Sequence, residues 1–147
     1  VYKGMSYAAA VAECTIDPAS GAVRVTGLWC AHDCGRVIDA DGVRAQTEGN
    51  LVWGIGMVLV EELRFDAGRV QAAQFDASPI PRLADVPPLV VELVDGGDAP
   101  GGAGETAIVA GAGAIANALR AATGTRFERF PVRAHDLRAA LAARPVA

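Results

Sequence analysis

The sequence has no long run of basic residues. Its 13 lysine and arginine residues are interspersed among 17 aspartate and glutamate residues, and the formal net charge is -4. Because nucleic acids and anionic membrane surfaces attract clustered positive charge, neither is an expected partner. Long apolar runs are also missing, since the longest, residues 51–60, is interrupted by Gly54 and Gly56 and is too short to cross a bilayer. The sequence therefore favours a soluble protein without a membrane span.

Cysteine is scarce and shows no metal-binding spacing. The three cysteines, Cys14, Cys30 and Cys34, form no Cys-x-x-Cys pair, and their odd number argues against a disulfide framework. His32 adds a Cys-x-His-x-Cys pattern between Cys30 and Cys34. Alternate residues of a strand share one face, however, and free cysteine is commonly buried. We interpret these residues as small core side chains and assign no metal ligands.

The chain has the size of a single domain. Its 147 residues, 52% of them hydrophobic, are enough to form one core. The sequence begins at Val1, and no basic, apolar and small-residue pattern of a secretory signal follows. We therefore expect a piece of a longer polypeptide and assign no compartment from the sequence pattern alone.

Turn signals and hydrophobic periodicity predict an α+β fold. The predicted strands are residues 7–17, 23–31, 62–65, 70–75 and 89–94, with residues 127–132 as an edge strand or extended arm. The predicted helices are residues 43–63, 108–123 and 135–143. Asp41 is the expected cap of the first helix, and its glycines Gly54 and Gly56 are expected to allow close contact with a sheet. We expect a mixed, mainly antiparallel β layer with two principal helices packed on it.

A glycine-rich loop, Pro100-Gly101-Gly102-Ala103-Gly104-Glu105, ends in a carboxylate and leads into the alanine-rich second helix. Glycine permits positive φ angles and close approach of backbone to a ligand. A carboxylate placed there can project into a cavity, where loss of water would raise its pKa toward that of a general base. The alternative is a flexible surface loop followed by a glutamate that favours a helix N-terminus. A phosphate-binding loop is disfavoured, because the stretch lacks the lysine and the serine or threonine of a P-loop.

The order of several short motifs resembles the C-terminal part of the molybdenum-binding subunit of the xanthine dehydrogenase and aldehyde oxidase family. These motifs are Asp33-Cys34-Gly35, Ile38-Asp39, Gln46-Thr47-Glu48-Gly49, Gly54-Ile55-Gly56, Glu61-Glu62, Gly101-Gly102-Ala103-Gly104-Glu105, Ala114-Ile115-Ala116-Asn117-Ala118 and Ala122-Thr123-Gly124. The Pro-Gly-Gly-x-Gly-Glu sequence of the loop is similar to the loop in catalytic subunits of the bacterial branch named after isoquinoline 1-oxidoreductase. Each motif is short and recurs elsewhere, so the resemblance depends on their order and spacing over almost the whole chain.

The resemblance implies a specific chemistry. Family members hydroxylate an aldehyde or an electron-poor N-heterocycle with oxygen derived from water, using a molybdenum-pterin cofactor with or without an added cytosine nucleotide. Glu105 matches the catalytic base, which takes a proton as the oxygen attacks the substrate. Gln46 matches a glutamine that hydrogen-bonds the pterin, although it also suits a helix surface. Gly102, Ala103 and Gly104 would let the loop backbone approach the metal ligands.

The resemblance also implies missing partners. The remainder of the catalytic subunit, a small subunit with two [2Fe-2S] clusters and a downstream electron acceptor would complete the enzyme, in the cytoplasm or periplasm of a bacterium. Two departures affect the loops: Asp39-Ala40 stands where an Asn-Pro pair is usual, and Thr106-Ala107 begins the stretch where a proline-rich continuation is usual. We expect the cofactor-binding and base-bearing part of a molybdenum hydroxylase, and two alternatives stay open. The first is a non-catalytic binding or assembly module that retains the fold, which these departures would suit, and the second is an unrelated nucleotide-binding domain, which the loop sequence disfavours.

Overall fold

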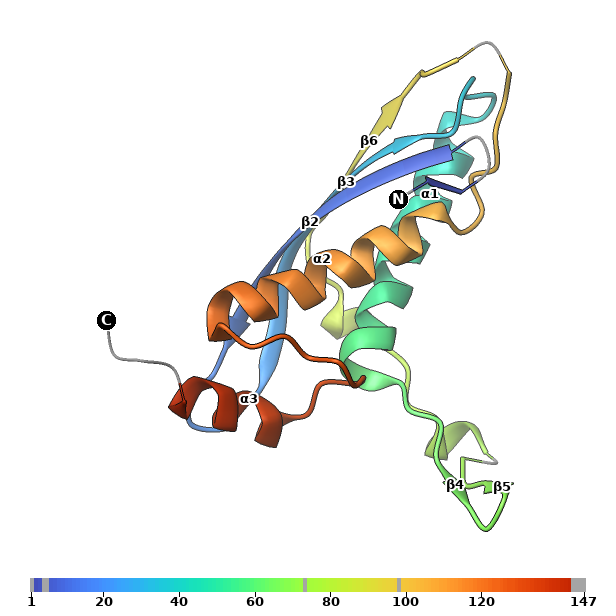
Figure 1. Cartoon of the computed structure of the whole chain (residues 1–147). Coiled ribbons are helices and arrows are strands. Elements are labelled where there is room, and N and C mark those ends of the chain that lie inside the picture. The colour runs from blue at the N-terminus through green and yellow to red at the C-terminus, as the bar shows by residue number, and fades with distance from the viewer. Residues whose placement is uncertain (1, 4–5, 73, 98, 144–147) are drawn as a thin grey trace.

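The computed structural model describes residues 2–3, 6–72, 74–97 and 99–143. These residues form a four-stranded sheet in the order β1-β2-β3-β6, with two long helices against it (Figure 1). The sheet strands are β1 (Tyr2–Lys3), β2 (Ser6–Ile16), β3 (Val23–Asp33) and β6 (Leu89–Val94). β1, β2 and β3 pair antiparallel, whereas β6 pairs parallel to β3. The predicted α+β class and mixed sheet are confirmed.

The β2–β3 hairpin forms as predicted and lies at the centre of the sheet. Its turn is closed by the Asp17 side chain, which accepts hydrogen bonds from the backbone amides of Ala19 and Ser20 at 2.8 and 3.2 Å. Gly21 supplies the left-handed residue of the turn, with φ of 74°. β3 continues to Asp33, two residues beyond the predicted end. This extension brings the end of β3 next to the segment that follows β6.

The two faces of the sheet differ in exposure. Residues that alternate along β2 and β3, such as Ala8, Leu28 and Cys30, are buried with Val91 of β6 against the helices. The opposite face, which we call the open sheet face, carries exposed apolar side chains. These are Tyr7, Val11, Trp29, Val90 and Val94. A solvent-facing sheet surface is normally polar, so this apolar face is suited to contact another protein segment.

Helix α1 (Ala40–Ile55) begins earlier than predicted and continues as a π-helix, Gly56–Val60. The N-cap is Asp39, not Asp41: Asp39 has an extended backbone, and its carboxylate accepts a hydrogen bond from the Gly42 amide at 3.1 Å. Asp41 lies inside the first turn, where its charge favours the helix N-terminus. The π-helix closes with a hydrogen bond from the Glu61 amide to the Gly56 carbonyl, at 2.8 Å.

Helix α2 (Thr106–Thr123) lies against β2 and α1, as Figure 1 shows. A Cβ atom on Gly54 would lie 2.9 Å from the Ala112 backbone nitrogen, and one on Gly111 would lie 2.9 Å from Leu51 Cδ2. The glycine in α1 therefore allows a close helix–helix contact, so the expected contact of Gly54 with the sheet is wrong. Gly56 instead faces the Glu61 side chain and Pro81. Gly124 ends α2 with φ of 76°, as the predicted Thr-Gly stop requires.

The remaining elements are short. β4 (Phe65–Asp66) and β5 (Arg69–Val70) form a hairpin of two-residue strands, shorter than the predicted strands at 62–65 and 70–75. Two 3₁₀ turns follow, at Phe75–Ala77 and Leu83–Asp85. Residues 127–132 form no strand, and Val132 donates instead to the Val58 carbonyl at 2.8 Å. The C-terminal helix α3 (Ala134–Ala142) matches its prediction within one residue at each end.

Within the described residues, every helix is too short or too polar to cross a bilayer.

Replacing Gly54 with alanine should destabilise the protein by about 1–3 kcal/mol, because the added methyl group would press on the α2 backbone. Gly49 is a matched control in the same helix, since no heavy atom lies within 4 Å of where its Cβ would stand. Gly49→Ala should therefore stabilise the helix by up to about 1 kcal/mol. Urea denaturation of the two variants measures both values, and equal effects of the two substitutions would contradict the proposed helix contact.

Candidate functional site

The glycine loop is fastened to the end of β3. Pro100 pairs with Gly35 in an isolated antiparallel bridge, and the Gly101 amide donates to the Cys34 carbonyl. The Arg36 amide donates to the Ala99 carbonyl at 3.2 Å. Because β3 and β6 run parallel, their carboxyl ends lie at the same edge of the sheet, and the loop that follows β6 crosses this edge to reach α2. Functional loops commonly occupy this position.

Glu105 occupies the N-cap position of α2. Its backbone is non-helical, with φ of -135°, and its side chain makes no capping hydrogen bond. The side chain is exposed in this chain, so the expectation that it projects into a cavity is not met by these residues alone. The alternative, a surface loop followed by a glutamate at a helix N-terminus, agrees with this position, which is one residue before α2 begins at Thr106. The carboxylate is thus held at the start of a helix without serving as its cap.

Side chains from α1 and β2 hold the carbonyl groups of the loop. Gln46 Nε2 and Asn50 Nδ2 both donate to the Gly104 carbonyl, at 2.7 and 3.0 Å. The Ser6 hydroxyl donates to the Gly102 carbonyl. The structure therefore brings the predicted residue Gln46 to the predicted loop. Asn50 and Ser6 were not predicted. Asn50 lies one helical turn after Gln46, and this spacing could have indicated it, whereas the sequence offers no such signal for Ser6.

The loop glycines face open space. No heavy atom of the described residues lies within 4 Å of where a Cβ would stand on Gly102 or Gly104. Neither has a positive φ angle, unlike Gly35 at 72°. Nothing within the described part of this chain therefore requires glycine at positions 102 and 104. Bare backbone that faces outward is what a ligand needs for close approach.

His32 is fully buried between the sheet and α1. Its Nδ1 lies 2.9 Å from the Thr47 hydroxyl, which donates its own proton to the Val43 carbonyl at 2.8 Å. This arrangement favours the tautomer in which Nδ1 carries the proton and donates it to the Thr47 oxygen. Nε2 is buried and has no hydrogen-bond partner among the described residues. Burial lowers the pKa of His32, partly opposed by the nearby Asp33 carboxylate, so the ring is neutral in the folded protein.

Burial keeps the three thiols protonated. Burial raises the pKa of Cys14 to about 11 and also raises the pKa values of Cys30 and Cys34. Cys30 and Cys34 are buried, as their spacing predicted. In the described part of the chain, no group of three or more histidine, cysteine, aspartate or glutamate side chains has the arrangement needed to hold a metal ion.

His32 should make folding stability depend on pH. Because its pKa is lower in the folded state, the unfolded chain binds the proton more readily; stability is full above about pH 6.5 and falls as the pH drops toward the folded-state pKa. His32 contributes at most about 1.4 kcal/mol per pH unit to the slope of the free energy of unfolding against pH. Urea denaturation between pH 7 and 5 should show a shallower slope for His32→Leu. The matched control replaces the exposed histidine, and His135→Leu should keep the wild-type slope of the free energy of unfolding against pH. Equal slopes for His32→Leu and the wild type would contradict a lowered pKa for His32 in the folded state.

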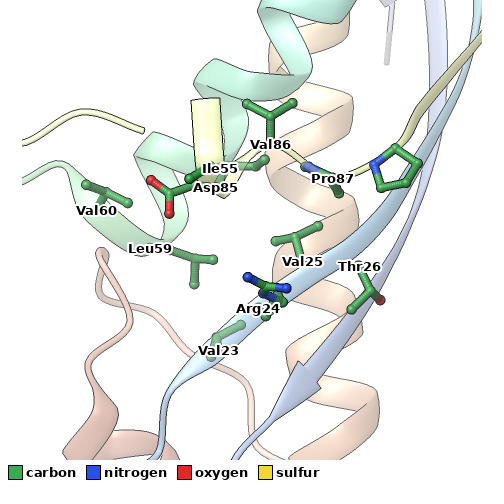
Figure 2. A pocket seen from close by; sticks show the side chains of 12 residues that line it. Val23, Arg24, Val25, Thr26, Ile55, Leu59, Val60, Asp85, Val86 and Pro87 are labelled. Carbon is green, nitrogen blue, oxygen red and sulfur yellow. The ribbon is translucent and has the colours of Figure 1, made fainter. Parts of the chain in front are cut away.

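A separate cavity of about 360 Å³ lies at the other end of β3 (Figure 2). Figure 2 shows side chains from the start of β3, the π-helix and the segment around Val86 surrounding it, including Val25 and Leu59. Thr26 in its lining and Cys34 beside the glycine loop are eight residues apart, which corresponds to roughly 25 Å along a strand. The cavity therefore belongs to a different region from Glu105.

Comparisons with known proteins agree on one family. A family model described as a molybdopterin cofactor-binding domain matches residues 1–87. The chain is 37% identical over 139 residues to a subunit of nicotinate dehydrogenase from Pseudomonas putida, covering 94% of this chain and 12% of that relative. It is 31% identical over 128 residues to the beta chain of isoquinoline 1-oxidoreductase from Brevundimonas diminuta, covering 87% of this chain and 16% of that relative.

A solved structure shares the fold. The crystal structure of quinoline 2-oxidoreductase from Pseudomonas putida 86 superposes with a TM-score of 0.80 at 26% identity, covering 90% of this chain and 18% of that chain. The present chain thus spans less than a fifth of the length of each of these three proteins.

Proposed function

Because this chain belongs to the molybdopterin cofactor-binding domains of the xanthine dehydrogenase and aldehyde oxidase family, we propose that it forms the base-bearing part of a molybdenum hydroxylase active site. The substrate class is an aldehyde or an N-heterocycle. The observation that carries the proposal is the glycine loop: its carbonyls are held from the inside by Ser6, Gln46 and Asn50, while its outer side is bare and ends in the exposed Glu105.

The residues present fit a molybdenum-pterin cofactor. Gln46 is exposed and uses one amide hydrogen on Gly104, which leaves its Oε1 acceptor and its second hydrogen for the edge of a heterocycle such as the pterin. Gly102, Ala103 and Gly104 would hold the backbone close to the cofactor, since no neighbour fills the space beside the two glycines. When bound, the cofactor supplies the redox centre of the reaction. The cofactor is proposed with or without an added cytosine nucleotide.

Glu105 supplies the general base in this proposal. Its carboxylate accepts the proton released as the substrate carbon gains oxygen, and its place at the end of a fixed loop limits the directions it can take. A carboxylate base is more effective when water is excluded around it, and Glu105 is exposed in this chain. The proposal therefore requires another protein segment to cover the loop.

The remainder of the catalytic subunit is the proposed covering segment. Two features support this: the chain spans 12% and 16% of the two curated relatives described above, and the open sheet face exposes Tyr7, Val11, Trp29, Val90 and Val94. A small subunit with two [2Fe-2S] clusters is the proposed electron carrier toward a downstream acceptor. The chain has three cysteines, fewer than the four that one such cluster needs, so the clusters would lie outside these residues.

Replacing Glu105 with glutamine in the complete enzyme should lower kcat by at least about 100-fold, because general base catalysis typically contributes 10²–10⁴-fold. Molybdenum content should stay at the wild-type level, since the amide keeps the shape of the side chain. Steady-state kinetics and metal analysis measure these two quantities, with the exposed Glu128→Gln as the matched control. Normal turnover of the Glu105→Gln enzyme would refute the assignment, and a wild-type complex without molybdenum would favour the non-catalytic module.

Replacing Gly104 with alanine should leave folding stability within about 0.5 kcal/mol of the wild type, because the methyl group meets no atom of this chain. Molybdenum content of the purified enzyme should nevertheless fall, since the methyl group would occupy the space proposed for the cofactor. Gly113→Ala is the matched control: it also faces open space but lies on the exposed side of α2, and it should leave molybdenum content unchanged. Full molybdenum occupancy of Gly104→Ala would contradict the proposed approach of the cofactor to this glycine.

A further inference from the structure

The Gly104 carbonyl is the last fixed point before Glu105. It belongs to the planar peptide group that joins the two residues, so its direction sets the plane from which the Glu105 side chain projects. Two amide groups on successive turns of α1 hold it, Gln46 at 2.7 Å and Asn50 at 3.0 Å. The Ile108 amide also donates to the Glu105 carbonyl, at 3.3 Å, and so holds the other side of the residue. The two bonds to Gly104 therefore contribute to the direction of the Glu105 carboxylate together with the first turn of α2.

Side-chain packing does not fix the end of the loop. Gly102 and Gly104 have no side chains, and the space beside both is open in the described part of the chain. Glycine also has the widest backbone freedom of any residue, so an unrestrained glycine pair would sample many directions. Hydrogen bonds to the carbonyl groups must supply the restraint that side chains do not.

The two donors to Gly104 differ in exposure. Asn50 is 2% exposed, whereas Gln46 is an exposed residue. Water readily replaces an exposed hydrogen bond, but a buried amide that loses its acceptor is left unsatisfied at a considerable cost. Gln46 is also the proposed contact of the pterin. Asn50 is therefore the donor whose bond to Gly104 persists whatever Gln46 contacts.

We infer that Asn50 is a positioning residue for Glu105: its buried amide fixes the peptide group before the carboxylate and so aims the proposed base. The inference rests on the proposed function, because it assigns Asn50 a role only through Glu105. Asn50 is not required to touch substrate or cofactor. It differs in this respect from Gln46, which both holds the loop and faces outward.

The test uses Asn50→Leu in the complete enzyme, since leucine has a similar volume but no donor. We expect kcat per molybdenum to fall roughly 10- to 100-fold, as a misplacement of about 1 Å produces, with KM and molybdenum content near wild-type values. Hydrogen–deuterium exchange of residues 101–106 should become faster. The matched control is Asn117→Leu, which removes an exposed amide from α2 and should change none of these quantities.

A second variant separates positioning from a general structural role. Asn50→Asp should donate to Gly104 only when its carboxyl is protonated, so the ratio of its kcat to the wild-type kcat should rise as the pH falls. A pH-independent ratio would overturn the inference, as would loss of molybdenum from Asn50→Leu with unchanged kcat per molybdenum. If Asn50→Leu turns over normally while Glu105→Gln does not, only this inference fails. If Glu105→Gln turns over normally, the proposed function fails.

Discussion

The close contact between α1 and α2 is the constraint on which the site depends. Gly54 and Gly111 allow the two helices to approach so closely that one added methyl group would lie 2.9 Å from an atom of the opposite helix. One turn before Gly54, Asn50 is thereby brought within hydrogen-bonding distance of the loop that precedes α2. A larger residue at Gly54 would press on the α2 backbone, which would separate the helices and lengthen this bond. Helix packing, amide positioning and the placement of Glu105 are thus parts of a single arrangement.

Much of the fold was predictable because it depends on local patterns. The β2–β3 hairpin follows from a turn sequence between two apolar segments, and Leu89–Val94 is a strand because of its run of β-branched and leucine residues. The stop of α2 at Thr123 follows from Gly124, which adopts the left-handed conformation that ends a helix. The glycine loop was recognisable from composition, and Gln46 from its motif.

Other features depend on contacts between distant residues, which local patterns do not specify. The Asn50 and Ser6 hydrogen bonds join residues 54 and 96 positions apart. The helical spacing from Gln46 places Asn50 on the same side of α1, but no spacing rule predicts which loop carbonyl either side chain reaches. The parallel pairing of β6 with β3 is set by the path of the intervening chain rather than by either strand. The choice of Asp39 over Asp41 as N-cap depended on which residue took an extended backbone, and both residues suit the role.

The glycine loop combines two properties that are not usually found together, namely a restrained inner side and a bare outer side. A surface loop whose only task is to connect β6 to α2 gains nothing from restraints by β2, by α1 and by the end of β3, since flexibility there costs little. A loop held only for stability would in turn not need bare backbone toward open space, because alanine would restrict the unfolded chain at no steric cost. Restraint on the inner side and bare glycine on the outer side are both required when another molecular surface must approach a backbone of fixed shape. The proposed half of an active site, with Glu105 where the two halves would meet, would satisfy both requirements.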